Sequence, residues 1–187
     1  MDARLDALAA AAVLKRGGVI AYPTEGVWGL GCDPFDAVAV QRLLALKCRP
    51  VEKGLILIAG ALSQLDSLVD LAALDPLRRD VVLESWPGAQ TWLLPATFEV
   101  PKWITGAHAS VAVRVSAHPP VRALCAAFGG ALVSTSANRA DAPAPRKFGE
   151  FDPALLAELD GGLAGETGGL GGPTPIRDTC SGERLRD

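Results

Sequence analysis

The segment from Lys47 to Gly54 holds three cations within seven residues, namely Lys47, Arg49 and Lys53, directly before the apolar residues 55–58. Lysine and arginine neutralise phosphate and carboxylate groups, and arginine can bind either group through two parallel hydrogen bonds. A solvated, charged turn would use the same residue types. The position of the segment next to a buried strand favours a site for an anionic ligand.

A polar string follows the apolar residues 131–133 and contains Ser134, Ser136 and Asn138. Hydroxyl and amide groups at the end of a strand suit phosphate oxygens or the edge of an adenine ring. A simple turn is built from the same residues, so the pattern alone leaves both interpretations open.

Residues 24–31 contain Thr24 and three glycines within six positions. Such spacing is typical of backbone that turns sharply or lets a ligand approach closely. Gly29 and Gly31 match the first two glycines of the dinucleotide fingerprint GxGxxG, but its third glycine is absent. The Walker A sequence GxxxxGK[ST] does not occur in the chain. Neither a Rossmann nor a Walker A phosphate site is indicated.

Arg114 lies in the apolar run from Val111 to Val115, where alternation places it on one face with Ala112 and the valines on the other. An arginine in such a strand either faces solvent on an open sheet or is paired with a carboxylate. That carboxylate could belong to the protein or to a substrate.

Other chemistry is poorly represented. His108 is expected in a turn and His118 at the start of a helix, so neither histidine suggests a base beside a nucleophile. The four cysteines form no CxxC pair and are predicted to be buried, reduced thiols: Cys32, Cys48, Cys125 and Cys180. The pattern favours catalysis by positioning and charge neutralisation, as in phosphoryl or nucleotidyl transfer.

Helices and buried strands must alternate to position these segments. Capping residues and apolar periodicity predict helices over residues 5–16, 36–47, 75–85, 119–128 and 152–159. Apolar runs predict strands over residues 19–22, 55–58, 91–94, 111–115 and 131–133. Residues 161–172 contain seven glycines and are expected to be mobile or to wrap around another part of the chain. The interleaving predicts an α/β fold with one mixed sheet.

Composition limits the remaining classes. The chain has 187 residues, 49% of them hydrophobic, and a net charge of −3, which is consistent with one globular domain and not with a surface that coats nucleic acid. No apolar run reaches the roughly 18 residues of a membrane span, and the N-terminus is acidic where a signal peptide is basic. We expect a cytoplasmic protein that does not bind membranes.

Taken together, these segments resemble the YrdC-like family of threonylcarbamoyl-AMP synthases. The similarity rests, in order, on residues 19–33, 46–58, 86–88, 111–115 and 134–138, and it extends from about Gly17 to Asp178. The family fold is a twisted, open, mixed α/β sheet flanked by helices around a concave basic cavity. The chain is similar to the short, single-domain (TsaC-type) members, which implies one YrdC-like domain over residues 1–187.

The resemblance implies an enzyme that joins L-threonine, bicarbonate and ATP into L-threonylcarbamoyl-adenylate and releases pyrophosphate. ATP is then a substrate, with Mg²⁺ carried by the nucleotide and no metal site on the protein. Transfer proteins would pass the threonylcarbamoyl group to the adenosine beside the anticodon of tRNAs that read codons beginning with A.

The same resemblance implies residue roles. Lys47 and Arg49 would be catalytic. The ATP-binding residues would be Arg49, Lys53, Ser110, Ser134, Ser136 and Asn138. The threonine-binding residues would be Thr24, Gly26 and Arg114, and a lid could include Thr174 and Arg186.

Two positions depart from the longer family members, which often carry threonine at the position of Gly26 and histidine at the position of Ile58. Two other functions compete with the synthase. One is a non-catalytic module that binds double-stranded RNA or tRNA, with an affinity that falls steeply with salt. The other is a former of carbamoyl-adenylate, as in hydrogenase-maturation carbamoyltransferases, although their acylphosphatase-like and zinc-finger segments are absent from this sequence.

Overall fold

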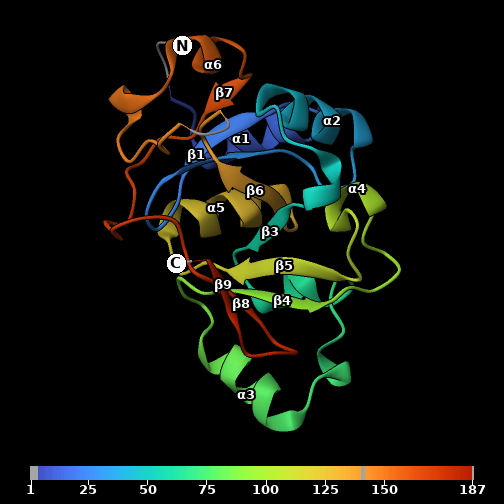
Figure 1. The fold of residues 1–187 in the computed structure, drawn as a ribbon. Helices are drawn as coiled ribbons and strands as arrows, with labels where there is room; N and C mark the ends of the chain where they lie inside the picture. The colour runs from blue at the N-terminus through green and yellow to red at the C-terminus, as the bar shows by residue number, and fades with distance from the viewer. Residues whose placement is uncertain (1–3, 140–141, 187) are drawn as a thin grey trace.

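A computed structural model describes residues 4–139 and 142–186, and the strands in these ranges form one mixed sheet of nine strands (Figure 1). Their order across the sheet is β7-β1-β2-β6-β3-β5-β4-β8-β9. The strands are β1 (Ile20–Pro23), β2 (Trp28–Gly31), β3 (Ile56–Ala59), β4 (Thr91–Pro95), β5 (Ser110–Val115), β6 (Leu132–Ser136), β7 (Gly161–Gly162), β8 (Ile176–Asp178) and β9 (Arg184–Arg186). The sheet is mixed because β3 runs parallel to β5 but antiparallel to β6.

Aspartate caps begin most of the helices. Asp6, Asp36, Asp75 and Asp152 each accept a hydrogen bond from a backbone N–H in the first turn that follows. The α-helices are α1 (Ala7–Leu14), α2 (Ala37–Leu46), α3 (Pro76–Glu84), α4 (Lys102–Thr105), α5 (Pro119–Phe128) and α6 (Pro153–Ala157). Short 3-10 helices are η1 (Val51–Lys53), η2 (Leu62–Leu65), η3 (Leu71–Ala73) and η4 (Phe148–Glu150).

The two faces of the sheet are covered differently. Helices α1 and α5 pack against each other and against β1 and β3, with Leu14, Ile58 and Leu124 buried between them. The opposite face carries the larger core, which includes Leu57, Val113 and Val133. Figure 1 shows α3 at the end of the molecule opposite α6 and β7.

Alternation in the central strands points one set of side chains toward the α1 and α5 face. In register, Ile56 lies between Ala112 and Ser134, and Ile58 lies between Arg114 and Leu132. The predicted separation of Arg114 and Ala112 from the neighbouring valines is therefore confirmed. The part of this face around Ile58 and Leu132 is apolar and buried. The part around Ser134 is polar.

Two predictions about local structure were wrong, and one strand was not predicted. The chain bends over residues 25–27 as expected, but residues 28–31 form strand β2, in which Gly31 leaves room for the ring of Tyr22, which a Cβ would approach to 2.7 Å. Ser134 and Ser136 lie inside β6 and not in a loop after it, since β6 continues its pairing with β2 and β3. The four cysteines are not all buried: Cys32 and Cys125 are, whereas Cys48 and Cys180 are exposed.

The five predicted helices and five predicted strands agree with the structure to within a few residues at their ends, whereas α4 and β7 to β9 were not predicted. The glycine-rich residues 161–172 wrap around the molecule: β7 pairs with β1, and further along Gly168 and Leu170 donate backbone hydrogen bonds to Thr24 and Glu25. Among the described residues, no helix is both long and apolar enough to cross a membrane.

Candidate active site

A cavity of about 510 Å³ opens on the polar part of the sheet face described above. Five basic side chains line it, and no aspartate or glutamate is found among the described residues of its wall; the basic residues are Lys47, Arg49, Lys53, Arg114 and Arg139. The chain as a whole has a net charge of −3. The positive charge is therefore concentrated in this cavity, which suits an anionic ligand.

The antiparallel strand β6 brings two of the predicted segments together. Ile56 at the start of β3 pairs with Ser134 in β6, so the polar end of β6 lies beside the basic segment that leads into β3. The cavity lies over the amino-terminal half of β3 and not only beyond the carboxyl ends of parallel strands. Ligands of open parallel sheets usually bind beyond the carboxyl ends of the strands, whereas this mixed sheet places opposite strand ends at one edge.

Lys47 caps the C-terminus of α2 and is only 6% exposed. Its ammonium group donates hydrogen bonds to the backbone oxygen of Ser136, to that of Asn138 at 2.6 Å and to the Asn138 side-chain oxygen at 3.5 Å. Burial, followed by repulsion from Arg49, lowers the pKa of Lys47 to about 8. These contacts fix a positive charge in the cavity wall before any ligand binds.

Arg49 is held by its own loop. Its Nη2 donates to the Gly54 oxygen at 2.9 Å and to the Lys53 oxygen at 3.4 Å, and burial lowers the pKa of its guanidinium. Cys48, between the two cations, has a φ of 50°, so the backbone turns there and both flanking side chains line the cavity. Lys53 is exposed and lines the same wall.

The residues predicted to bind ATP all line this cavity. Ser134 and Ser136 project from β6, and Ser110 begins β5. The Asn138 side-chain nitrogen donates to the Ala142 oxygen at 2.6 Å, which orients its oxygen toward Lys47. Ser110 and Arg114 are four residues apart on one strand, or roughly 13 Å at about 3.3 Å per residue.

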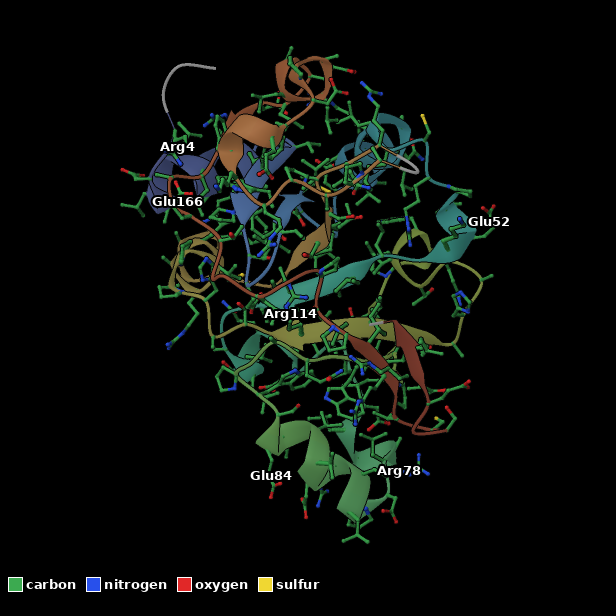
Figure 2. All side chains as sticks on the ribbon, turned by 60° about the vertical axis from the view of Figure 1, so that its left-hand side comes forward. Arg4, Glu52, Arg78, Glu84, Arg114 and Glu166 are labelled. Carbon is green, nitrogen blue, oxygen red and sulfur yellow. The ribbon has the colours of Figure 1, made fainter. Side chains whose placement is uncertain are left out.

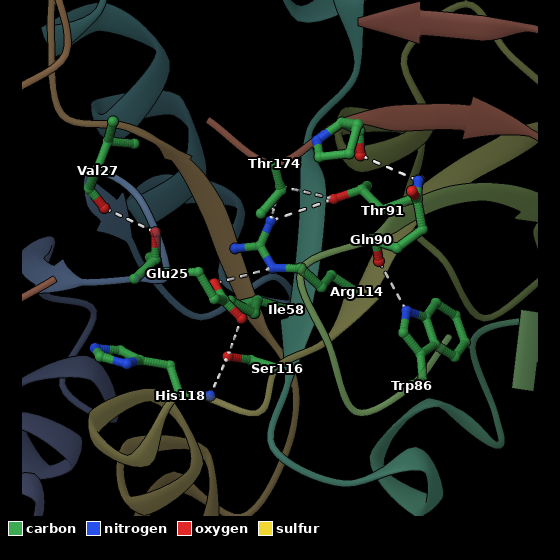
Figure 3. A network of polar contacts seen from close by, with 12 residues as sticks. Glu25, Val27, Ile58, Trp86, Gln90, Thr91, Arg114, Ser116, His118 and Thr174 are labelled. Atoms are coloured by element: carbon green, nitrogen blue, oxygen red, sulfur yellow. Dashed lines mark hydrogen bonds and ion pairs between the residues drawn. The ribbon is translucent and has the colours of Figure 1, made fainter. Parts of the chain in front are cut away.

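Arg114 lies at the far end of that strand, near the middle of the molecule (Figure 2). It is 4% exposed, and its Nη1 donates to the hydroxyls of Thr91 at 3.2 Å and of Thr174. Its Nε lies 3.5 Å from the Glu25 carboxylate (Figure 3). Arg114 is therefore paired with a carboxylate of the protein and does not face solvent on an open sheet. Its side chain also lines the cavity.

The other predicted threonine-binding residues are placed differently. Thr24 lines the cavity and donates its hydroxyl proton to the Val27 oxygen at 2.7 Å. Gly26 is not among the lining residues; a Cβ on it would stand 1.8 Å from the Gly172 oxygen. The glycine-rich segment lies directly over Gly26.

The two lid candidates also differ. Thr174 lines the cavity and its hydroxyl is 3.1 Å from that of Thr91. The backbone of Arg186 belongs to the outer strand β9, paired with Ile176 in β8, and its side chain lies outside the described part of the structure.

Sequence reasoning missed three residues of this region. Glu25 follows Thr24 but pairs with a strand far along the chain, and Thr91 opens a strand that reads as apolar. Arg139 directly follows Asn138, and that adjacency could have singled it out. Its guanidinium pairs with Asp152 at 3.3 Å and Glu158 at 2.7 Å, and these carboxylates raise its pKa.

No cluster of three or more histidine, cysteine, aspartate or glutamate side chains suited to a metal ion occurs among the described residues. The cavity offers hydroxyls, an amide and cations, which suit phosphate and carboxylate oxygens.

The fold and the cavity define a class of protein: an α/β protein with an open mixed sheet whose concave face gathers cations around an anion site. The sequence model of the Sua5/YciO/YrdC family, described as "Telomere recombination", matches residues 12–186. The chain belongs to this family.

Curated relatives are similar over nearly the whole chain. A protein of Xanthomonas euvesicatoria pv. vesicatoria (strain 85-10) named threonylcarbamoyl-AMP synthase is 58% identical over 187 residues, covering 100% of both chains. A protein of the same name from Stenotrophomonas maltophilia (strain K279a) is 59% identical over 177 residues, covering 95% of each.

Solved structures share the fold. P. abyssi Sua5 complexed with L-threonine superposes with a TM-score of 0.85 at 27% identity, over 95% of this chain and 52% of that one, so the present chain spans about half the length of that protein. E. coli YciO superposes with a TM-score of 0.77 at 25% identity, over 97% of this chain and 90% of that one. The predicted fold, an open mixed α/β sheet flanked by helices, is confirmed.

Proposed function

We propose that this protein is a threonylcarbamoyl-AMP synthase, a nucleotidyltransferase that makes L-threonylcarbamoyl-adenylate from L-threonine, bicarbonate and ATP and releases pyrophosphate. The proposal rests on one observation: a single set of cavity-lining residues includes both Arg114 on β5 and the cations of the basic segment. These cations are Lys47, Arg49 and Lys53. Two separated cationic groups suit a substrate pair with phosphates on one side and a carboxylate on the other.

The reaction builds negative charge at the basic wall. The amine of threonine captures bicarbonate or CO₂ to give a carbamate, and a carbamate oxygen then attacks the α-phosphorus of ATP as the bond to pyrophosphate breaks. Lys47 and Arg49 would stabilise the charge on the phosphate oxygens in this step, since fixed cations in a cavity lower the barrier without needing to reorganise. Lys53 would bind the departing pyrophosphate.

The remaining lining residues would hold the two substrates. The hydroxyls of Ser110, Ser134 and Ser136, together with the Asn138 amide, would bind the nucleotide. Arg114 would bind the carboxylate of threonine, and Thr24 would contribute to the amino-acid side of the cavity. Thr174 would close over the bound amino acid.

ATP is a substrate in this proposal, and Mg²⁺ would be carried by its phosphates. The adenylate would then be consumed by proteins that transfer the threonylcarbamoyl group to tRNA in the cytoplasm. A non-catalytic RNA-binding module is not favoured, because the relatives of nearly full length are named as synthases.

Mass spectrometry of the product tests the proposal. The purified protein is incubated with ATP, L-threonine and ¹³C-bicarbonate, and the expected product is a threonylcarbamoyl-adenylate that carries the ¹³C label. Formation of AMP or ADP without a labelled adenylate would contradict the assignment. Carbamoyl phosphate in place of threonine and bicarbonate serves as a control for the carbamoyl-adenylate reaction.

A further inference from the structure

The Arg114 side chain is only 4% exposed, so its positive charge needs a negatively charged partner close by. Glu25 supplies it: the Glu25 Oε2 atom lies 3.5 Å from Nε of Arg114, and the two side chains are 11% and 4% exposed. Each of these two atoms is buried without a hydrogen bond to any described residue. Each is therefore the charged complement of the other.

Hydrogen bonds hold both the carboxylate and the backbone of Glu25. Ser116 donates its hydroxyl proton to Oε1 at 2.6 Å, and the same hydroxyl oxygen accepts the backbone N–H of His118 at 3.1 Å. Because a hydroxyl has one proton, the bond from His118 fixes that proton on the side of Glu25. The backbone oxygen of Glu25 also accepts a hydrogen bond from Leu170 at 2.9 Å.

The other edge of the guanidinium is held by hydroxyls. Nη1 of Arg114 donates to Thr91 and Thr174, whereas Nε faces Glu25. Figure 3 shows the remaining nitrogen, Nη2, directed away from both threonines. Glu25 is not among the residues that line the cavity, so it supports Arg114 from behind without placing a negative charge in the wall.

We propose that Glu25, oriented by Ser116, is a positioning residue that fixes the Arg114 guanidinium for the carboxylate of the amino-acid substrate. The inference rests on the proposed function, because it assigns Arg114 to that carboxylate. Without the charge of Glu25, the guanidinium has no complement behind it and leaves the orientation that the carboxylate requires. ATP binding does not depend on this pair, since the phosphate wall is built by the segment around Lys47.

Steady-state kinetics of four variants test the proposal through pyrophosphate release. Glu25→Gln should raise the KM for L-threonine about 10- to 100-fold, which corresponds to the loss of one hydrogen bond from Arg114 to the carboxylate of the substrate. The KM for ATP should stay unchanged. Ser116→Ala should give a smaller rise for threonine alone. Glu25→Asp, which keeps the charge, should recover part of the loss.

Glu166→Gln is the matched control, because Glu166 is 70% exposed and pairs with Arg4 outside the cavity (Figure 2). It should leave both KM values at those of the wild-type protein. A KM for threonine within about twofold of wild type in folded Glu25→Gln overturns the proposal, as does an equal rise in the KM for ATP. If Glu25→Gln does not fold, the threonine-specific rise in Ser116→Ala decides.

A nuclear magnetic resonance measurement separates this proposal from the proposed function. The Arg114 Nε–Hε resonance, assigned with Arg114→Lys, should shift and exchange faster with solvent in Glu25→Gln but not in Glu166→Gln. An unchanged resonance overturns the positioning role even if the protein makes the adenylate. A changed resonance in a protein that releases no pyrophosphate shows that the proposed function is what has failed, and the positioning of Arg114 for an amino acid falls with it.

Discussion

Replacement of Lys47 by alanine is the sharpest perturbation of the phosphate wall. Lys47 is 6% exposed and its ammonium group is held by the oxygens of Ser136 and Asn138, so it is a fixed charge that water cannot replace with equal effect. Loss of one such preorganised group costs about 2.7–4 kcal/mol of transition-state stabilisation, or roughly 100- to 1,000-fold in turnover.

The fold should survive this substitution. Removing the side chain leaves two backbone oxygens without their donor, but both residues line the cavity, where water can reach the space vacated by the side chain. The net effect on the free energy of unfolding should stay within about 1–2 kcal/mol, because a hydrogen bond to water replaces each lost contact. The rate loss is therefore separable from unfolding.

Pyrophosphate release at saturating ATP, threonine and bicarbonate is the assay, with thermal unfolding measured in parallel. Lys15→Ala is the matched control, since Lys15 caps the C-terminus of α1 and donates to the Ala127 oxygen at 3.2 Å in an exposed position. The control should keep wild-type turnover. Near-normal turnover in both Lys47→Ala and Arg49→Ala would refute the assignment of this wall to the phosphates.

Three other outcomes are expected. Because the Lys47 pKa is lowered to about 8, its ammonium group loses its proton as pH rises through that value. The ATP affinity of the wild type, measured by calorimetry, should therefore fall above about pH 8, whereas that of Lys47→Ala should not change with pH. A wild-type affinity that does not change with pH would contradict this. Arg114→Ala should raise the KM for threonine selectively, and an equal loss of ATP affinity would argue against its carboxylate role. Gly26→Ala places a Cβ 1.8 Å from the Gly172 oxygen and should lower the free energy of unfolding by about 1–3 kcal/mol in chemical denaturation, whereas Gly149→Ala, with no atom within 4 Å, should not.

The same pKa shift has a consequence for stability. The Lys47 pKa is lower in the folded chain than in the unfolded one, so the unfolded chain binds the extra proton above about pH 8. The contribution of this group to folding is unfavourable below that pH. It is relieved as pH rises from about 8 toward the ordinary pKa of lysine.

Much of the fold follows from local patterns in the sequence. The aspartate caps at Asp36 and Asp75 gave the starts of α2 and α3, and the alternation through Arg114 gave the face on which it lies. These features depend on residues a few positions apart. The basic segment and the polar end of β6 were each recognisable for the same reason.

Contacts between distant parts of the chain were not predictable in this way. Ser116 and Glu25 are 91 positions apart, and no periodicity links them. Strand β2 was missed because Gly29 and Gly31 lower strand propensity, while the packing of Tyr22 on Gly31 requires glycine there. The union of the two predicted segments in one cavity depends on the antiparallel pairing of β3 with β6, which only the assembled sheet shows.

The most direct measurement is pyrophosphate release from ATP by the purified protein with each co-substrate omitted in turn. Release that requires both L-threonine and bicarbonate is the predicted result, because the carbamate that attacks ATP needs both. Release without either co-substrate, or none with all of them present, would contradict the assignment of the cavity to threonylcarbamoyl-adenylate synthesis.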